Sequence, residues 1–163
     1  MDLQERFEVF HDFRNMALLT AGSMEDYNTM TIGWGALGTI WGKPVCTVYV
    51  RPSRYTLEFM DRNDLFTVSF FDGYKKDLSY LGSHSGRDED KVAKTELTAV
   101  PAGDSVAFKE AREILVCRKL YRQLMDESAF PEKVVEQFYS GGDEGDIHYM
   151  FIGEVIDIIR GED

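Results

Sequence analysis

The fold is best indicated by the stretch PVCTVYVRPSRYT, residues 44–56. Pro44 opens an expected strand over residues 45–51, whose side chains alternate between two sides. One side carries Val45, Thr47, Tyr49 and Arg51, and the other carries Cys46, Val48 and Val50. Apolar residues occur on both sides, which is typical of a strand in a closed barrel. Ser53 then suits the cap of a helix that runs to about Asp61.

Working outward, short strands outnumber helices, and the helices fall in the connections. Further strands are expected at residues 16–21, 29–34, 65–71, 111–125 and 147–160, and helices at 3–13, 77–81, 88–95 and 131–139. The first two strands should form a hairpin whose loop, at 23–28, has a functional role. The pattern predicts a single domain over residues 1–163, mainly β with α, as a barrel with peripheral helices. A doubly wound parallel sheet fits poorly, because that first connection is too short for a helix.

The composition limits the classes of partner. The 163 residues carry a formal charge of -11, from 29 acidic and 18 basic side chains, which argues against nucleic acid. An anionic ligand would need a local cluster of donors, although solubility alone also explains the acidic excess. Cys46 and Cys117 lack metal-site spacing and are expected to be buried free thiols in a reducing compartment. The polar start and the absence of a long apolar run predict a soluble, cytoplasmic protein without membrane contact.

Residues 51–56 are the first candidate site. A strand ends at Arg51 and a helix begins with hydroxyl groups and free backbone amides, which together suit an anion such as phosphate. Ser53 and Thr56 add donors, and Arg51 and Arg54 add charge-assisted hydrogen bonds. Local chemistry alone leaves a plain helix start equally possible.

Two further segments are candidates. NTMTIGWG, residues 28–35, places polar groups, glycines and an indole on one strand, and Trp34 and Trp41 are both able to pack on a planar ring. A glycine-broken hairpin with an aromatic core explains this segment as well. GSHSGR, residues 82–87, with Lys91, is able to close over a phosphate or polyol group, but also suits a solvated connector.

Signatures of other enzyme classes are missing from the sequence. It contains no GxSxG, GxxxxGK[ST], HExxH or GxGxxG motif. His11, His84 and His148 are far apart in the chain, so no metal site is expected. Spacing ties no acid, base or nucleophile together, and the catalytic residues are unknown at this stage.

Taken in order, several motifs resemble the flavin reductase-like family. They are NTMTIGW (28–34), Pro44, VRPSRYT (50–56), Asn63 with FTVSF (66–70), LGSHSGRD (81–88), Asp90 with Lys91, and HYMFIGEV (148–155). The resemblance covers most of the chain beyond Asn15 and implies an FMN-binding split β-barrel that works as a homodimer, with the flavin near the subunit interface.

The resemblance also implies roles for particular residues. The flavin ring and ribityl chain would be flanked by Asn28, Thr29, Met30, Thr31, Ile32 and Trp34. The phosphate end would lie at Val50, Arg51, Ser53, Arg54 and Thr56, and Ser83, Ser85, Gly86 and Lys91 would close around it.

The implied function is that of an FMN-dependent oxidoreductase, which takes electrons from NADH or NADPH and passes them to an unidentified acceptor. The family's short reductases carry Gly-Asp-His near the last strand, whereas residues 145–148 here read GDIH. The alternative is therefore a flavoredoxin-like carrier, with tightly bound FMN and a redox partner protein. A third interpretation is a barrel that has lost flavin and acts as a dimeric interaction module.

Overall fold

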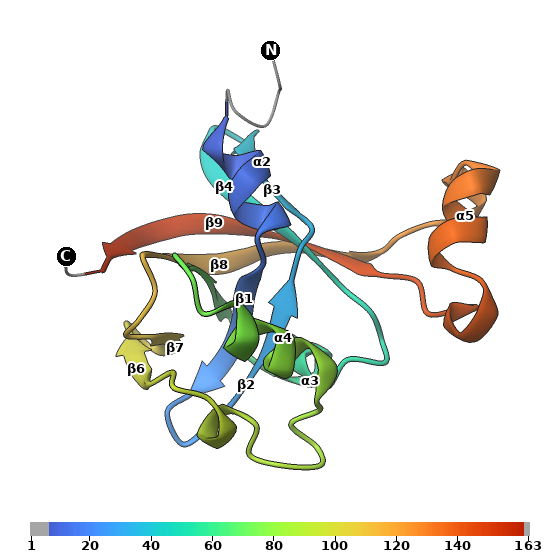
Figure 1. Ribbon diagram of the computed structural model, residues 1–163. Helices are drawn as coiled ribbons and strands as arrows, with labels where there is room; N and C mark the ends of the chain where they lie inside the picture. Colours follow the sequence, from blue (N-terminus) through green and yellow to red (C-terminus); the bar gives the residue numbers. More distant parts are fainter. Residues whose placement is uncertain (1–6, 162–163) are drawn as a thin grey trace.

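A computed structural model describes residues 7–161 of the chain (Figure 1). The strands are β1 (Ala17–Ser23), β2 (Asp26–Ile32), β3 (Gly35–Ile40), β4 (Lys43–Val50), β5 (Leu65–Phe70), β6 (Ala99–Ala102), β7 (Ser105–Phe108), β8 (Glu113–Leu124) and β9 (Tyr149–Arg160). The helices are α2 (Glu8–Arg14), α3 (Thr56–Arg62), α4 (Lys75–Ser83) and α5 (Glu132–Phe138), with 3-10 turns η1 (Val92–Lys94), η2 (Glu127–Ala129) and η3 (Gly141–Asp143). The expected mainly β class is confirmed.

Seven strands form one antiparallel sheet in the order β2-β1-β5-β8-β9-β4-β3. β2 and β3 are its two edges, yet only Gly33 and Trp34 separate them in the chain. Three Cα steps span at most about 11 Å, so the sheet has to curl until its edges approach one another. The two edges do not pair, and the barrel is therefore split between β2 and β3.

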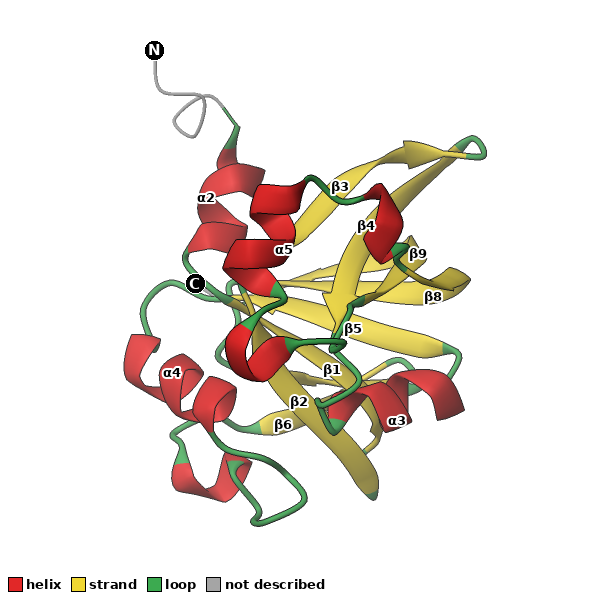
Figure 2. Cartoon of the chain, turned by 90° about the vertical axis from the view of Figure 1, so that its right-hand side faces the viewer, coloured by secondary structure: helices red, strands yellow, loops and turns green. Residues whose placement is uncertain are grey.

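Two apolar clusters fill the two faces of the curled sheet. Leu19 of β1 lies in the cluster inside the barrel, while its neighbour Leu18 lies in a second cluster that α4 covers with Leu78 and Leu81. β1 is thus buried on both faces, as alternating side chains in a covered strand require. The helices lie outside the strands (Figure 2).

α2 closes one end of the barrel. Its buried Phe13 packs edge-on against Phe70, with ring centroids 5.3 Å apart. Gly35 makes room for this contact, because a Cβ atom at that position would overlap the Phe13 ring. The glycine that was expected to let a ligand approach the backbone therefore serves packing instead.

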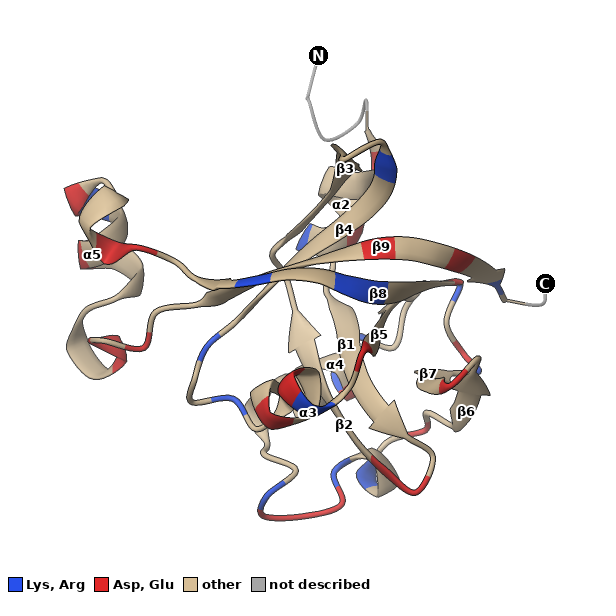
Figure 3. Cartoon of the chain, turned by 180° about the vertical axis from the view of Figure 1, so that it is seen from behind, with Lys and Arg blue, Asp and Glu red and all other residues tan. Residues whose placement is uncertain are grey.

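Between β8 and β9 the chain leaves the barrel as an arm, defined here as residues 126–147. α5 of this arm stands away from the other elements in Figures 1 and 3, and Figure 3 shows acidic residues along it. Two register shifts between β8 and β9, at Val116/Cys117 and Lys119/Tyr121, interrupt the ladder below the arm. Such irregularities bend and twist a strand pair strongly.

Several expected elements differ from the structure. The loop expected at 23–28 is a tight turn, because β1 and β2 stay paired as far as Ser23 and Asp26. The helix expected at 88–95 is only η1, since 88–90 are consecutive acidic residues that repel one another and lack an apolar stripe. β3, β6 and β7 were not expected. The part of the first helix over residues 3–6 lies outside the described residues.

The remaining elements match their expected positions within a few residues. β4, β5, β8, β9 and α5 occupy the segments 45–51, 65–71, 111–125, 147–160 and 131–139, and α4 extends the segment 77–81 in both directions. Cys46 and Cys117 are buried and free, as expected.

Candidate functional site

The candidate site is built around the turn between β4 and α3. The amide of Arg54 donates to the carbonyl of Arg51 over 3.0 Å, and α3 begins only at Thr56. The Ser53 amide donates to Asp146 Oδ1 over 3.0 Å, and its hydroxyl donates to Asp146 Oδ2 over 2.5 Å. The expectation that Ser53 caps the helix is wrong, because the residue before the first turn of α3 is Tyr55 and no side chain among residues 7–161 accepts a capping hydrogen bond there.

Arg51 holds the same arm. Its guanidinium donates to the carbonyls of Asp146 and Phe138, over 3.1 and 3.0 Å, and lies 5.0 Å from the centroid of the Tyr139 ring. These contacts fix the end of α5 and the loop after it. Two of the five N–H donors of the Arg51 guanidinium thus serve the chain itself, and its role toward an anion stays a prediction.

A cavity of about 180 Å³, which we call the cation cavity, opens beside this turn. It is lined by Asn28, Ser53, Arg54, Tyr55, Thr56, Gly82, Ser83, His84, Ser85, Gly86 and Lys91. The walls come from β2, from the start of α3 and from the loop after α4, three segments distant in sequence. The cavity brings together most of the residues expected at an anion site.

Two positive charges face each other in the cation cavity. Lys91 is buried and donates to the carbonyls of Leu81 and His84, both over 2.9 Å. Burial and the nearby Arg54 lower its pKa to about 8, although Glu89 acts in the opposite direction. Burial likewise lowers the pKa of Arg54, whose guanidinium donates, among the described residues, only to the Gly82 carbonyl, over 3.3 Å. Two like charges held together out of water favour an anion between them.

A hydrogen bond between buried side chains joins β2 to α3 at the cavity wall. Asn28 Nδ2 donates to Thr56 Oγ1 over 2.8 Å. Gly86 lies directly against this pair, because a Cβ atom there would overlap Asn28 Oδ1. The glycine allows the loop after α4 to approach β2 closely, and any side chain at this position would push the loop outward.

A second cavity of about 160 Å³, which we call the Trp34 cavity, adjoins the first. It is lined by Met30, Thr31, Ile32, Gly33, Trp34, Tyr49, Arg51, Arg54 and His148. Arg54 lines both cavities. The Trp34 indole is half-exposed, at 48%, and packs edge-on against Phe138 of the arm, with ring centroids 5.1 Å apart. The two cavities together form an elongated site, with cations at one end and an aromatic ring at the other.

His148 and Tyr139 form a buried pair beside Trp34. Tyr139 Oη lies 2.6 Å from His148 Nδ1, and the His148 ring lies 5.3 Å from the indole of Trp34. Burial and the nearby Arg51 lower the pKa of His148 to about 4, and Asp146 opposes this shift. Burial raises the pKa of Tyr139. His148 is therefore neutral near pH 7, and one hydrogen bond joins Nδ1 to the Tyr139 hydroxyl, with the donor set by the imidazole tautomer.

Some expected site residues lie elsewhere. The buried hydroxyl of Thr29 donates to the Leu19 carbonyl over 3.2 Å, inside the barrel wall. The Val50 side chain is fully buried in the core and lines neither cavity. Trp41 lies in the turn between β3 and β4, where its ring is 6.5 Å from Tyr121, and it lines neither cavity. Thr31 lines the Trp34 cavity, but its hydroxyl donates to the Leu78 carbonyl.

Sequence reasoning missed Asp146, Tyr139 and His148 as site residues. A signal existed for two of them, because GDIH at 145–148 is a variant of a motif of the family that the sequence resembles. Nothing local marks Tyr139, since a tyrosine at the end of an amphipathic helix is ordinary.

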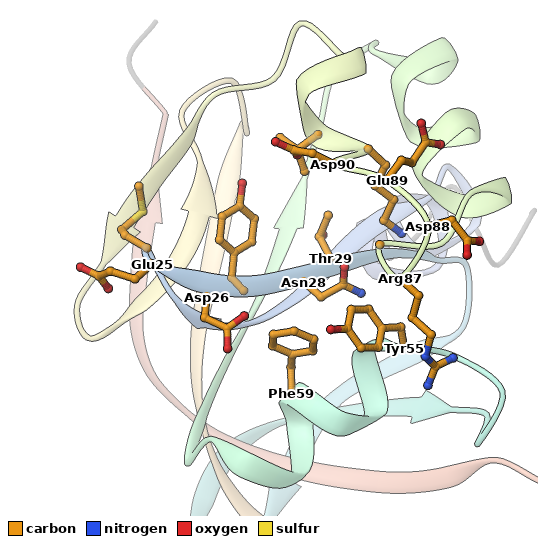
Figure 4. Close-up of a pocket in the computed structure, with 15 residues that line it drawn as sticks. Glu25, Asp26, Asn28, Thr29, Tyr55, Phe59, Arg87, Asp88, Glu89 and Asp90 are labelled. Carbon is orange, nitrogen blue, oxygen red and sulfur yellow. The ribbon is translucent and has the colours of Figure 1, made fainter.

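A larger, acidic cavity of about 550 Å³ shares Asn28, Tyr55, Gly86 and Lys91 with the cation cavity. Figure 4 shows the rings of Tyr55 and Phe59 projecting from α3 below Asn28. Carboxylates surround this cavity on two sides, from Glu25, Asp26, Asp88, Glu89 and Asp90. The cations of the smaller cavity are thus a local exception on an acidic face.

Among residues 7–161, no three His, Cys, Asp or Glu side chains gather in an arrangement that suits a metal ion. Within the same residues, no helix is long and apolar enough to cross a membrane.

The chain is similar to known proteins in both sequence and structure. The flavin reductase like domain matches residues 13–163. A flavoredoxin from Methanosarcina acetivorans is 27% identical, with a TM-score of 0.67 over 90% of this chain and 68% of that one. An FMN-binding protein from Thermus thermophilus is 22% identical, with a TM-score of 0.68 over 89% of this chain and 69% of that one.

The styrene monooxygenase flavin reductase from Pseudomonas putida S12 is 16% identical, with a TM-score of 0.65 over 90% of this chain and 79% of that one. At such low identity this likeness, like that to the Thermus protein, shows the fold alone. The comparison with curated protein sequences finds no match. The match of the family domain covers almost the whole chain, and the expected split-barrel fold is confirmed. The chain belongs to the flavin reductase-like family.

Proposed function

We propose that this protein binds FMN and acts as an oxidoreductase that transfers electrons from NADH or NADPH to FMN and on to an acceptor. The observation that carries the proposal is the pair of a half-buried Arg54 and a buried Lys91, which line one cavity of about 180 Å³ on a chain of charge -11. A phosphate group would relieve the repulsion between these charges and accept their hydrogen bonds.

The residues present fit both the phosphate and the planar ring of FMN. Besides the two cations, the amides of Tyr55 and Thr56 donate to no partner among the described residues and lie at the start of α3, where backbone donors favour anions. The Trp34 cavity offers apolar walls and an indole to a planar ring. Arg54 lines both cavities, so a single ligand is able to contact it from either end.

When bound, FMN supplies the hydride and electron chemistry of the reaction. The protein then has to hold the ring, exclude water and place hydrogen-bond donors at the ring edge. His148 suits the last of these roles in the tautomer in which Tyr139 donates to Nδ1 and Nε2 carries the imidazole proton. No acid or base among the side chains is required.

The proposal is tested with purified protein by flavin titration and by steady-state turnover. We expect FMN to bind more tightly than riboflavin, which lacks the phosphate, and NADH or NADPH to reduce the bound FMN faster than free FMN in buffer. Equal affinity for FMN and riboflavin would refute the proposed phosphate site. If neither flavin binds, the proposed flavin function is refuted.

A flavoredoxin-like electron carrier is the second candidate, and one observation favours it. Ser53 donates twice to the Asp146 carboxylate and Nδ1 of His148 is paired with Tyr139, so both side chains of the GDIH segment are already engaged within the chain. The carrier should keep FMN through purification and be reduced by dithionite, but not by either nicotinamide. Rapid reduction by NADH or NADPH would exclude this alternative.

We further propose that the protein is a homodimer. β3 is an edge strand whose residues beyond Gly35 are all exposed, including the apolar Leu37 and Ile40. Between β3 and α2 lies an apolar cavity of about 800 Å³ that reaches Trp34. Exposed apolar surface of this extent is typical of interaction sites. Light scattering should give twice the 18.7 kDa of one chain, and Leu37→Glu should give the monomer mass.

A further inference from the structure

The contact between Ser53 and Asp146 lies at the edge of the cation cavity. Ser53 lines that cavity, yet the Asp146 carboxylate accepts both of its hydrogen bonds, from the amide over 3.0 Å and from the hydroxyl over 2.5 Å. An amide and a hydroxyl next to a helix start are the donors that a phosphate oxygen uses. The carboxylate therefore occupies donors that a phosphate in the cavity would otherwise take.

The position of Asp146 is fixed rather than incidental. Its own carbonyl accepts a hydrogen bond from Arg51 over 3.1 Å, and the same guanidinium holds the Phe138 carbonyl over 3.0 Å. The loop that carries the carboxylate is thus tied to the end of β4 at a second point. Moving Asp146 away from Ser53 would disturb these contacts.

The charge of Asp146 also acts inside the cavity. It favours the charged form of Arg54, where it opposes the effect of burial on the pKa. Part of the positive potential of the cavity is therefore compensated before a ligand arrives. A phosphate next to Arg54 would meet this carboxylate as a like charge.

We infer that Asp146 sets the affinity for the phosphate of the flavin: by holding Ser53 and offsetting Arg54, it keeps FMN a dissociable ligand rather than a permanently bound group. The inference rests on the proposed binding of FMN. Asp146 is thus a specificity residue, because its carboxylate weakens the binding of phosphorylated flavins and leaves the binding of riboflavin unaffected.

The test compares the Kd and the dissociation rate of FMN, with riboflavin as the ligand without phosphate, in the wild type and in Asp146→Asn. Asparagine keeps an acceptor for Ser53 but removes the charge. Asp143→Asn is the matched control, because it makes the same charge change on an exposed residue of the same loop. We expect Asp146→Asn to tighten FMN binding about tenfold or more, through slower dissociation, and to change riboflavin binding less than twofold.

The possible outcomes separate the inference from the proposed function. If the wild type binds FMN and Asp146→Asn binds it equally or more weakly, FMN binding stands and the role of Asp146 is refuted. The same conclusion follows if FMN and riboflavin tighten by the same factor, or if Asp143→Asn has an equal effect. If none of the variants binds either flavin, the proposed function fails and the inference fails with it.

Discussion

Replacing Arg54 with glutamine removes one of the two positive charges of the cation cavity. In the free protein this guanidinium donates, among the described residues, only to the Gly82 carbonyl, over a long 3.3 Å, and its presence lowers the pKa of Lys91. The glutamine amide is able to keep the contact with Gly82, and the repulsion of Lys91 disappears. We therefore expect the free energy of unfolding to change by less than about 1 kcal/mol.

In the FMN complex the same substitution removes a charged donor from the phosphate. Hydrogen bonds to charged groups contribute about 1.5–3 kcal/mol, which corresponds to a Kd for FMN that is roughly 10- to 150-fold higher. Riboflavin has no phosphate, so its Kd should rise less than about threefold. The ratio of the two Kd values thus reports the phosphate contact separately from any change in the Trp34 cavity.

The assay is quenching of flavin fluorescence on titration, with thermal unfolding measured on the same samples. Arg118→Gln is the matched control, because Arg118 is an exposed cation of β8 whose partner is Asp64, at 3.4 Å. It removes the same charge far from the cavity in sequence. An unchanged FMN affinity in Arg54→Gln, or an equal loss for riboflavin, would refute the placement of the phosphate.

Buried titratable groups lead to three more predictions. Affinity for FMN should be constant between about pH 7, where the phosphate is doubly ionised, and about pH 8, and should then fall, because free Lys91 loses its proton there and binding must restore it; titration across this range measures the effect. The free energy of unfolding should fall as pH drops from 6.5 towards 4, by at most about 3 kcal/mol, because the unfolded chain protonates His148 first; urea unfolding of the wild type and His148→Gln checks this. Cys46 and Cys117 should react with a thiol reagent only after unfolding, since both are buried, and the hydrogen bond with Cys46 together with burial raises the pKa of Cys117.

The sequence predicted those parts of the fold whose residues carry their own signal. β5 and β8 have runs of apolar and β-branched residues, and strands of this composition form wherever a neighbour covers them. β3 has the sequence GALGTI, which alternates too weakly to predict a strand. Its position is set by the two-residue link from β2 and by pairing with β4, and its own side chains contribute little to either.

The site was predictable to the extent that its chemistry is local. Arg54, Gly86 and Lys91 lie in segments whose small and charged residues suggested an anion site, and the structure brings all three to one cavity. The contact of Ser53 with Asp146 joins residues 93 positions apart, and no periodicity reveals such a pair. The sequence therefore indicated which residues surround the cavity, but not which donors are already engaged.

The arm connects the two ends of the elongated site. Ser53 holds it at the cation cavity. At the other end Arg51 holds the Phe138 carbonyl, and Phe138 and Tyr139 pack beside Trp34 and His148. Removing the arm would consequently alter both cavities, and affinities for FMN and riboflavin would change together. Asparagine at position 146 keeps an acceptor for Ser53 and so keeps the arm in place. A difference between the two flavins in that variant therefore reports the charge of the carboxylate and not the packing of the arm.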